Sequence, residues 1–381
     1  MTTRIIAIGM DVHSTNYTLC AIEKRWFETD RYIGTVDVGP DVKHILKFIK
    51  EIEKIYPNDE IKVTCGYEAG GLGYSIQRKL KEKKINCVIM APTTMKRSAD
   101  QAVKKNDRRD AKDIAELLLS GGYNEVYVIT ENDEDVKGFI RMRSDLVDQR
   151  KTTRQNISSF CLQHGEKYDE GTATWTGKHM EWLKKLQLRA LARETLDEYM
   201  IHLDQLNEQI KRIEERIEEL STRIEYVEKV SRLKCFLGIK TLTALACVVE
   251  IGDFSRFNKA KDFAAFLGLV PGMHDSGDKN KRMPITKAGN SHLRKMLIES
   301  SGGICKGRVG YKSKDLKQRQ KGNDPKVIAY ADKANIRLRK RYYHLIEMGK
   351  NRNVAKTAVA RELACFIWGM MTNNIERLPQ V

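Results

Sequence analysis

Residues 4–12 read RIIAIGMDV, and two further β-rich runs follow closely, YTLCAIE at 17–23 and RYIGTVDV at 31–38. Only short polar breaks separate the three runs, so they can pair as an antiparallel meander. The chain then alternates between a helix opened by Pro40, a buried strand in IKVTCGYEA, a helix in GYSIQRKLKEK and a buried strand in INCVIMAP. A last helix, DAKDIAELLLSGG, is expected to stop at Gly121 and Gly122. This order predicts an α/β domain whose sheet begins with antiparallel strands.

The order of these elements is that of a ribonuclease-H-like fold, and acidic residues stand where such a fold would gather them. Asp11 ends the first strand, and Glu68 ends a strand expected to lie parallel beside it. The stretch KKNDRRDAKD at 104–113 places Asp107, Asp110 and Asp113 at intervals of three, which aligns them along one side of a helix. In the simplest interpretation, the flanking lysines and arginines neutralise these acids on a solvated face. In the other, carboxylates from the strands and the helix meet to bind divalent cations.

The positions of four of these acids favour the metal interpretation. A nuclease of this fold uses two Mg²⁺ ions to bracket the attacking and leaving oxygens of a phosphodiester. We therefore predict the ligands of a two-Mg²⁺ site as Asp11, Glu68, Asp107 and Asp110. Asp113 is expected to be an acid of the helix surface. Cations beside the acids are expected to face phosphates, namely Lys104, Lys105, Arg108 and Arg109. Nearby glycines are expected to leave room for a nucleic-acid backbone, namely Gly9, Gly66, Gly70 and Gly71.

The positive charge of the chain is concentrated in one region. The net charge of the 381 residues is +17. Between Lys279 and Arg361 there are 23 Lys and Arg residues against five acids, a net charge of +18, so the remainder is close to neutral. A basic field confined to one region is typical of a surface that binds a polyanion. A basic face without a partner is the alternative, and the lack of an amphipathic helix with aromatic anchors disfavours a membrane.

Helical periodicity dominates from Asp133 onwards. One helix is expected to run to Gly165, and a second from about Met180 to Val230. In the second, apolar residues alternate gaps of three and four, forming a heptad seam of Leu196, Tyr199, Leu203, Leu206, Ile210, Ile213, Ile217, Leu220, Ile224 and Val227. Such a period predicts a coiled coil, whose partner is either another subunit or another segment of this chain. The expected regions are an α/β domain (1–132), a helical linker with the coiled coil (133–232) and a mainly helical C-terminal domain (233–381).

The rest of the composition bounds the cellular setting. No apolar run is long enough for a transmembrane helix, and the first residues enter a strand pattern without the features of a signal peptide. Eight cysteines are scattered singly, without a CxxC pair, which is typical of reduced, buried thiols. We expect a cytoplasmic protein without a membrane partner.

A series of motifs resembles that of one known family. In order, the motifs are IGMDVH, YEAGG, KNDRRDAKDIA, LGIKTLTALACVVEIGDFSRF, AAFLGLVPG, DSGDK and ITKAGNSHLRKML. Over nearly the whole chain they are similar to those of the IS110/IS1111 family of insertion-sequence transposases, with its Piv-type invertase relatives. The resemblance implies a RuvC-like N-terminal domain with the DEDD acids Asp11, Glu68, Asp107 and Asp110, a coiled-coil connector and a transposase domain with Ser276 as nucleophile. It also implies that a noncoding bridge RNA specifies donor and target DNA.

Ser276 has a second interpretation, because a Ser between Asp and Gly in a polar loop is most often a turn residue. The catalytic interpretation gains from the basic surroundings, since a hydroxyl that attacks a phosphodiester needs cations to stabilise the transition state. The cations expected to bind nucleic acid are Lys279, Arg282, Lys287, Arg294, Lys312, Lys314, Lys317 and Arg319. No base is adjacent in sequence, which makes the metal site, in the same or another subunit, the candidate proton acceptor.

Three classes of function compete. The first is a DNA recombinase with metal-ion and serine chemistry, acting on donor and target DNA as a homo-oligomer, a dimer or tetramer joined by the coiled coil. The second is a RuvC-like endonuclease, a junction resolvase without a covalent intermediate. The third is a sugar-kinase-like ATPase, which also begins with an Asp at the end of its first strand. That third fold requires a second phosphate loop and a Gly-Gly motif, where this chain has the coiled coil instead.

Overall fold

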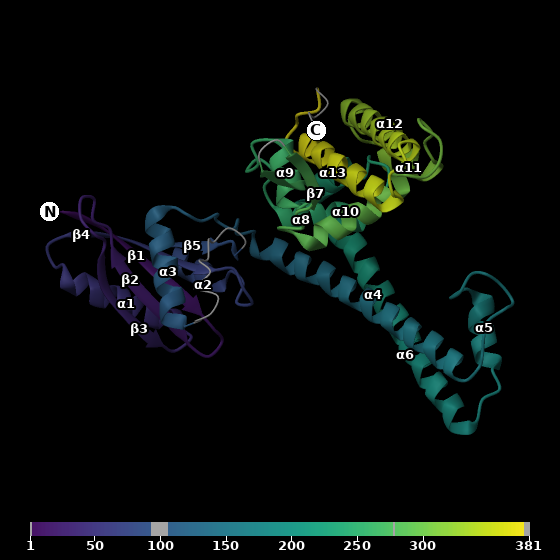
Figure 1. Cartoon of the computed structure of the whole chain (residues 1–381), viewed down its shortest axis with the longest axis horizontal. Helices are drawn as coiled ribbons and strands as arrows, with labels where there is room; N and C mark the ends of the chain where they lie inside the picture. Colours follow the sequence, from purple (N-terminus) through teal and green to yellow (C-terminus); the bar gives the residue numbers. More distant parts are fainter. Residues whose placement is uncertain (1, 93–105, 277–278, 377–381) are drawn as a thin grey trace. The chain divides into compact units, whose positions relative to one another are not determined.

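The computed structural model describes residues 2–92, 106–276 and 279–376, without the side chains of 273–282. Its contacts divide the chain into two compact units, Met1–Val128 and Ile129–Val381 (Figure 1). The second unit joins the predicted linker region and the predicted C-terminal region around one large core. Among the described residues, no helix is long and apolar enough to cross a membrane.

The first unit alternates strands and helices as the sequence predicts. Its elements are β1 (Thr3–Val12), β2 (Tyr17–Glu23), β3 (Arg31–Val38), α1 (Val42–Ile55), β4 (Glu60–Glu68), α2 (Ser75–Glu82), β5 (Asn86–Met90) and α3 (Asp107–Ser120). The strands lie in the order β3-β2-β1-β4-β5. The first three strands are antiparallel, and β4 and β5 run parallel to β1. The predicted antiparallel meander is confirmed, and the strand order is that of a ribonuclease-H-like sheet.

The alternation of side chains along β1 assigns the two faces of this sheet. Ile6, Ile8 and Met10 are buried in one cluster with the apolar residues of α1 and α2. Ala7 belongs to a second cluster with residues of α3, which lies along the sheet (Figure 1). Because neighbouring residues of a strand point to opposite faces, Gly9 and Asp11 share the α3 face with Ala7. Asp11 is thereby directed toward α3.

The second unit is mainly helical. Its elements are α4 (Glu131–Gln163), α5 (Gly177–Lys185), α6 (Ala190–Ser221), α7 (Val227–Leu233), α8 (Thr241–Ile251), α9 (Ala260–Phe266), β6 (Pro271–Ser276), β7 (Lys279–Ile285), α10 (Ser291–Ile304), α11 (Lys314–Gln320), α12 (Pro325–Glu347) and α13 (Arg352–Met371). The antiparallel hairpin of β6 and β7 is absent from the sequence prediction. Its runs, PGMHDS and KNKRMPI, contain a single β-branched residue, Ile285, and so lack the usual composition of strands.

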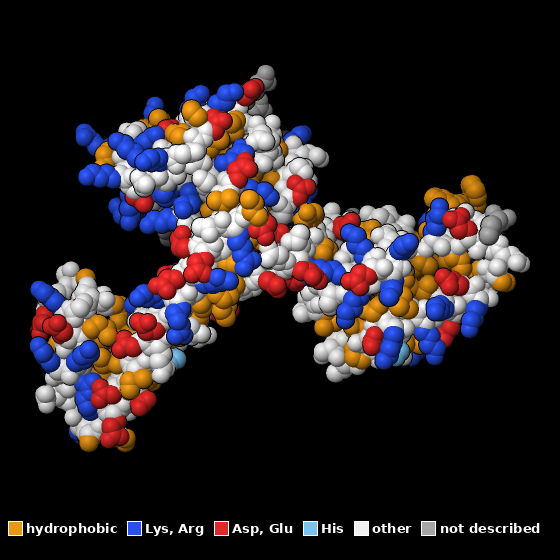
Figure 2. Space-filling view, turned by 180° about the vertical axis from the view of Figure 1, so that it is seen from behind, with side chains coloured by type: hydrophobic (Ala, Val, Ile, Leu, Met, Phe, Trp, Pro, Cys, Tyr) orange, Lys and Arg blue, Asp and Glu red, His pale blue; other side chains and the backbone are white. Residues whose placement is uncertain are grey.

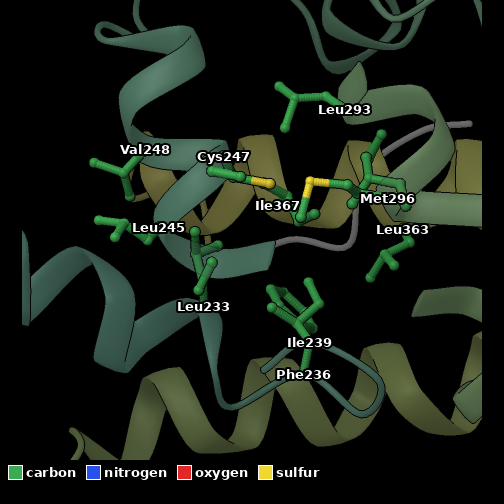
Figure 3. Close-up of a cluster of buried hydrophobic side chains, with 14 of the residues drawn as sticks. Leu233, Phe236, Ile239, Leu245, Cys247, Val248, Leu293, Met296, Leu363 and Ile367 are labelled. Atoms are coloured by element: carbon green, nitrogen blue, oxygen red, sulfur yellow. The ribbon is translucent and has the colours of Figure 1, made fainter. Parts of the chain in front are cut away.

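The core of the second unit forms where α7, α8, α10 and α13 meet. Figure 3 shows Leu233, Leu245, Met296 and Ile367 converging in this cluster. Cys247 lies among them, and all eight cysteines of the chain are buried and free. The predicted burial of the thiols is therefore confirmed.

The predicted second long helix is wrong in its continuity, because the chain forms α5, α6 and α7 instead. After Ser221 the chain turns, and Tyr226 enters the core with its hydroxyl donating to Asp133 Oδ1 at 2.9 Å. Burial of this tyrosine competes with the heptad repeat, which leaves the seam residue Ile224 91% exposed.

The seam of α6 finds its partner within the same chain. Its residues from Leu206 to Leu220 lie in one buried cluster with Val136 and Ile140 of α4, and the two helices run side by side (Figure 1). Of the two partners that the sequence left open, a segment of this chain covers this part of the seam.

Candidate functional site

Polar side chains form a row across the sheet on the face that bears α3. The register of β1 and β2 pairs Asp11 with Thr18, and that of β2 and β3 pairs Thr18 with Asp37. The parallel register of β1 and β4 ends with Met10 beside Tyr67, so Asp11 and Glu68 are the next residues of the two strands. Residues paired across strands point to the same face. Asp37, Asp11 and Glu68 therefore lie in one row at one end of the sheet.

Gly9 allows α3 to come close to this row. A Cβ at Gly9 would lie 2.0 Å from Ala111 O and 2.4 Å from Ala115 N, so the backbone of α3 occupies the space that a side chain would need. A Cβ at Gly66 would lie 3.0 Å from a methyl group of Leu118. The sequence prediction that these two glycines admit a nucleic-acid backbone is therefore wrong, since α3 fills both positions. A Cβ at Gly71 would meet nothing within 4 Å, and one at Gly70 only Glu68 O at 3.9 Å.

The N-terminus of α3 supplies the remaining predicted ligands. The Asn106 side chain caps the helix by accepting a hydrogen bond from Arg108 N. Asp107 and Asp110 both lie in the first turn, where the helix dipole stabilises negative charge. Two acids can therefore be held together there at a lower cost than in the middle of a helix.

Asp11, His13 and Asp107 form the tightest group. One ligand atom from each residue lies within 4.8 Å of the other two. His13 Nε2 is 3.3 Å from Asp11 Oδ2, an ion-pair distance, yet no described residue gives that buried oxygen a hydrogen bond of good geometry. The pKa of Asp11 is raised, and burial is the main cause. The charges of Asp107 and Asp110 also raise this pKa, while the nearby His13 lowers it. The site is an electrostatically crowded, half-buried set of hard oxygen and nitrogen donors.

Sequence reasoning missed His13. It stands two residues after Asp11 in IGMDVH, and side chains two apart along an extended chain point to the same side. That spacing was the available signal for its place in the group.

Glu68 and Asp110 lie outside this tight group but border it. Glu68 ends β4 next to Asp11, and it is half-buried. Asp110 is close enough for its charge to raise the pKa of Asp11. Asp113, predicted as a surface acid, is also half-buried, and burial followed by the charge of Glu116 raises its pKa. Asp107 is thus the acid that shares a group within 4.8 Å with Asp11, and the charge of Asp110 also acts on Asp11.

The cations beside the acids differ in their surroundings. Arg108 donates to Asp37 Oδ2 from Nε at 3.1 Å and from a terminal nitrogen at 2.6 Å, while Thr18 Oγ1 donates to Asp37 Oδ1 at 3.0 Å. The hydrogen bond from Arg108 holds the pKa of Asp37 below its usual range. Arg109 is exposed, and Lys104 and Lys105 lie outside the described residues. Arg108 is therefore held to the sheet, and its contact with a phosphate stays a prediction.

Ser276 is the last residue of β6, at the tip of the hairpin. Its side chain, and those of Lys279 and Arg282 on β7, lie outside the described part of the chain. Lys287 follows the hairpin, exposed and with a φ of 55°. The hairpin explains how Ser276 can stand at the end of an ordered element and not in a free loop.

Three of the predicted nucleic-acid-binding cations bind the protein itself. Arg294 donates to Leu267 O at 2.9 Å, and burial lowers its pKa. Arg319 donates to Lys234 O at 2.7 Å and to Asp315, and Lys312 donates to Gln320 Oε1 at 2.9 Å while pairing with Asp332. Their hydrogen bonds support the fold, which a count of charges in the sequence cannot show. Lys314 and Lys317 are exposed.

A buried carboxylate connects the helices behind the hairpin. Glu250 of α8, with its side chain 1% exposed, accepts two hydrogen bonds from Arg141 of α4 and one from Asn290. His292 Nδ1 lies 2.8 Å from Glu250 Oε1, and His292 Nε2 lies 3.0 Å from Ser144 Oγ. Burial by itself would raise the pKa of Glu250, but the hydrogen bonds and charge of its partners lower it to about 2. This network was also missed, although an acid inside the apolar run ALACVVEIG was its signal.

Comparison with known proteins places the chain among transposases. A family model described as "Transposase IS116/IS110/IS902 family" matches residues 230–318, and a DEDD transposase model of IS110 matches residues 8–165. The chain is 31% identical to the transposase y4qE of Sinorhizobium fredii, over 95% of this chain and 87% of that protein. It is 28% identical to the transposase of insertion sequence element IS1533 of Leptospira borgpetersenii, over 90% and 97% of the two chains.

A further relative is the pilin gene-inverting protein of Moraxella bovis, with 33% identity over 34% of this chain and 39% of that protein. The two family models match the segments that contain the carboxylate group and the β6–β7 hairpin. The similarity to the Sinorhizobium fredii protein spans both units. The chain belongs to the IS116/IS110/IS902 family of transposases, enzymes that act on DNA.

Proposed function

We propose that this transposase cleaves and rejoins donor and target DNA at a centre formed by Asp11, Glu68, Asp107 and Asp110, which would hold two Mg²⁺ ions. The observation that supports it is the buried Asp11 Oδ2, which accepts no hydrogen bond of good geometry from a described residue although His13 Nε2 lies 3.3 Å away. A carboxylate oxygen of Asp107 belongs to the same group, within 4.8 Å. An unpartnered buried carboxylate oxygen is costly. A divalent cation removes that cost, and hard carboxylate oxygens are the ligands that Mg²⁺ prefers.

The protein side chains have separate tasks at this centre. Bound Mg²⁺ would supply Lewis-acid stabilisation of the phosphodiester as its charge grows. Asp11 and Glu68, fixed on neighbouring strands, hold the floor of the centre, and Asp107 and Asp110 on α3 close it from the side. His13 keeps Asp11 in place through its 3.3 Å contact with Oδ2.

The proposal includes Ser276 as the nucleophile. Its Oγ would form a phosphoester with one DNA end while the leaving oxygen of the broken strand takes up the proton. A hydroxyl of the other DNA would then attack this phosphoserine, which restores the serine and conserves one phosphodiester bond per exchange. What supports this assignment is the match of residues 230–318 to the family model, together with the place of Ser276 at the hairpin tip.

A noncoding bridge RNA and a homo-oligomer complete the proposal. The RNA would specify donor and target DNA, and the basic region from Lys279 to Arg361 would neutralise its phosphates. The relatives support recombination as the activity, since one of them is named as a gene-inverting protein. A dimer or tetramer would use surfaces other than the seam between α4 and α6, which is already buried.

Substitution of the acids tests the metal centre. Asp11→Asn and Asp107→Asn should abolish strand cleavage and exchange by the purified protein, because loss of one carboxylate breaks the cation clamp. The same variants should bind DNA and RNA normally and should lose the rise in unfolding temperature that added Mg²⁺ gives the wild type. Asp113→Asn is the matched control on α3. Full activity of Asp107→Asn, or a dead Asp113→Asn variant, would show that the assigned acids are wrong.

A further inference from the structure

A basic groove lies between α12 and α13. It encloses about 450 Å³ and is lined by Arg337, Lys340, Arg341 and His344 of α12 and by Arg361 and Glu362 of α13. The two helices pack against each other over much of their length. Figure 2 shows Lys and Arg side chains gathered on the side of this unit that α11 and α12 form.

The spacing of the α12 residues sets all their charges on one face. Residues 337, 340, 341 and 344 follow the i, i+3, i+4, i+7 pattern of a single helical stripe. Like charges at this spacing repel and destabilise a helix by a few tenths of a kcal/mol per pair. An anion that approaches the stripe, from the protein or from a ligand, relieves this repulsion.

The protein supplies a single anion to the groove. Glu362 is buried and paired with Arg337, whose guanidinium also lies 5.8 Å from the ring centre of Phe366. Lys340, Arg341 and Arg361 have neither an ion pair nor a hydrogen bond within the part of the chain that the structure describes. The side chain of Arg361 is half-buried. Four cations and one acid leave the groove with a net charge of +3 when His344 is neutral.

The shape and chemistry of the groove indicate which anion it takes. The stripe from Arg337 to His344 is about 10 Å long at 1.5 Å per residue. Along the axis of a duplex, the phosphates of one strand advance by about 3.4 Å, so the stripe can contact two or three of them. Guanidinium groups bind phosphate oxygens in pairs. Neither tyrosine nor tryptophan lines the groove to stack on a base.

We propose that the groove between α12 and α13 holds the phosphodiester backbone of a nucleic-acid strand without reading its bases. This inference rests on the proposed function in taking nucleic acid as the partner, and it locates the contact at three side chains. RNA and DNA share the recognised chemistry. The competing model is a diffuse basic field, in which every exposed cation of the region contributes alike.

Two variants that remove equal charge separate these models. The groove variant is Lys340→Gln/Arg341→Gln/Arg361→Gln. The matched control is Lys306→Gln/Arg308→Gln/Lys321→Gln, whose side chains are exposed and lie outside the groove. Both leave the paired Arg337 and Glu362 in place. Binding of the full chain to a fluorescent DNA duplex and to a fluorescent RNA hairpin, both of arbitrary sequence, is titrated across a salt series in EDTA, which removes any contribution from metal-dependent chemistry.

The groove variant should bind more weakly, and its plot of log affinity against log salt should be less steep. Each lost phosphate contact lowers the slope by about 0.9 on duplex DNA and about 0.7 on a single strand, so three lost contacts change it by roughly 2 to 3. The control should change the slope by a small fraction of that. A loss confined to RNA, or to DNA, supports the groove and identifies the strand that it holds.

Two results would overturn the inference alone. One is a groove variant that binds both probes as the wild type does, and the other is an equal loss in the groove variant and the control. Wild-type protein that binds neither probe would overturn the proposed function as well. If the triple variant unfolds at a lower temperature, the exposed pair Lys340→Gln/Arg341→Gln repeats the comparison against Lys306→Gln/Arg308→Gln.

Discussion

The carbonyl oxygen of Ala111 lies 2.0 Å from the point where a Cβ of Gly9 would stand. This crossing fixes the distance between β1 and α3. Asp11 follows Gly9 by two residues on the same face of the strand, and Asp107 precedes Ala111 by four residues, one turn of the helix. The contact of two backbones thus brings two carboxylates into one group.

Gly9→Ala should separate the strand from the helix. Overpacking of this kind costs about 1–3 kcal/mol, so the free energy of unfolding of the unit Met1–Val128 should fall by that amount in urea denaturation. The stabilisation by added Mg²⁺ should fall with it, because Asp11 and Asp107 move apart. Gly34→Ala is the matched control, since a Cβ there meets nothing within 4 Å. Equal stability of the two variants would show that α3 adjusts without loss.

The fold of the first unit was open to prediction because each of its elements has its own periodicity. The meander, the helices and the stop of α3 at Gly121 all follow from local pattern and turn chemistry. The grouping of Asp11 with Glu68 was predicted from the topology, because adjacent parallel strands end at the same edge of a sheet. Contacts between segments distant in sequence were not predictable, such as the one between Arg108 and Asp37.

The second unit shows where sequence periodicity fails. The heptad pattern continues through Ile224, but burial of Tyr226 against α4 ends the helix earlier. Charge counting likewise could not separate Arg319, which binds backbone carbonyls, from the exposed Lys317. The periodicity of a sequence shows which residues of one helix share a face. Where the helix ends and which segments it packs against depend on the packing of the whole core.

Ile213→Lys/Ile217→Lys tests which partner the seam of α6 has. Both isoleucines are buried in a cluster with residues of α4, so two charges placed there should cost several kcal/mol and lower the unfolding temperature. The mass by light scattering should stay that of the wild type, because the seam pairs within the chain. Ile224→Lys, at a position 91% exposed, should change neither quantity. A folded double variant of smaller mass would show that the seam joins subunits.

Glu250 should make the second unit sensitive to acid. Its pKa is lowered to about 2 from the ordinary value of 4.5, so its contribution to stability is complete above pH 4.5 and is lost as the pH falls toward 2. Glu250→Gln should lower the free energy of unfolding at neutral pH by roughly 3 kcal/mol and should remove most of the loss within that pH window.

The control for this prediction is Glu214→Gln. Glu214 pairs with Arg143 on the same α4, but its side chain is 47% exposed, so its loss should cost at most about 1 kcal/mol. Urea denaturation at a series of pH values measures both variants. An acid profile of Glu250→Gln identical to that of the wild type would contradict the assigned role of the buried pair.

Ser276→Ala should remove strand exchange and any covalent protein–DNA adduct while binding of RNA and DNA persists. Exchange between two DNA sites without an external energy source must conserve the energy of the phosphodiester bond, and an ester between Ser276 and a DNA end does so. Ser276→Cys should retain a trace of activity, because a thiolate is a nucleophile at the same position. The adduct is trapped by denaturation during the reaction, digested, and mapped by mass spectrometry.

Two other serines provide controls for that map. Ser291 is the exposed first residue of α10, and Ser300 is buried with its hydroxyl 3.3 Å from Thr243 Oγ1. Their alanine variants should still exchange strands, and the adduct should map to neither. An adduct at Ser291 would move the nucleophile past the hairpin to the next helix. Wild-type protein that cleaves DNA with no adduct at any time would instead favour a junction resolvase, in which the acids at Asp11 and Asp107 act with water alone.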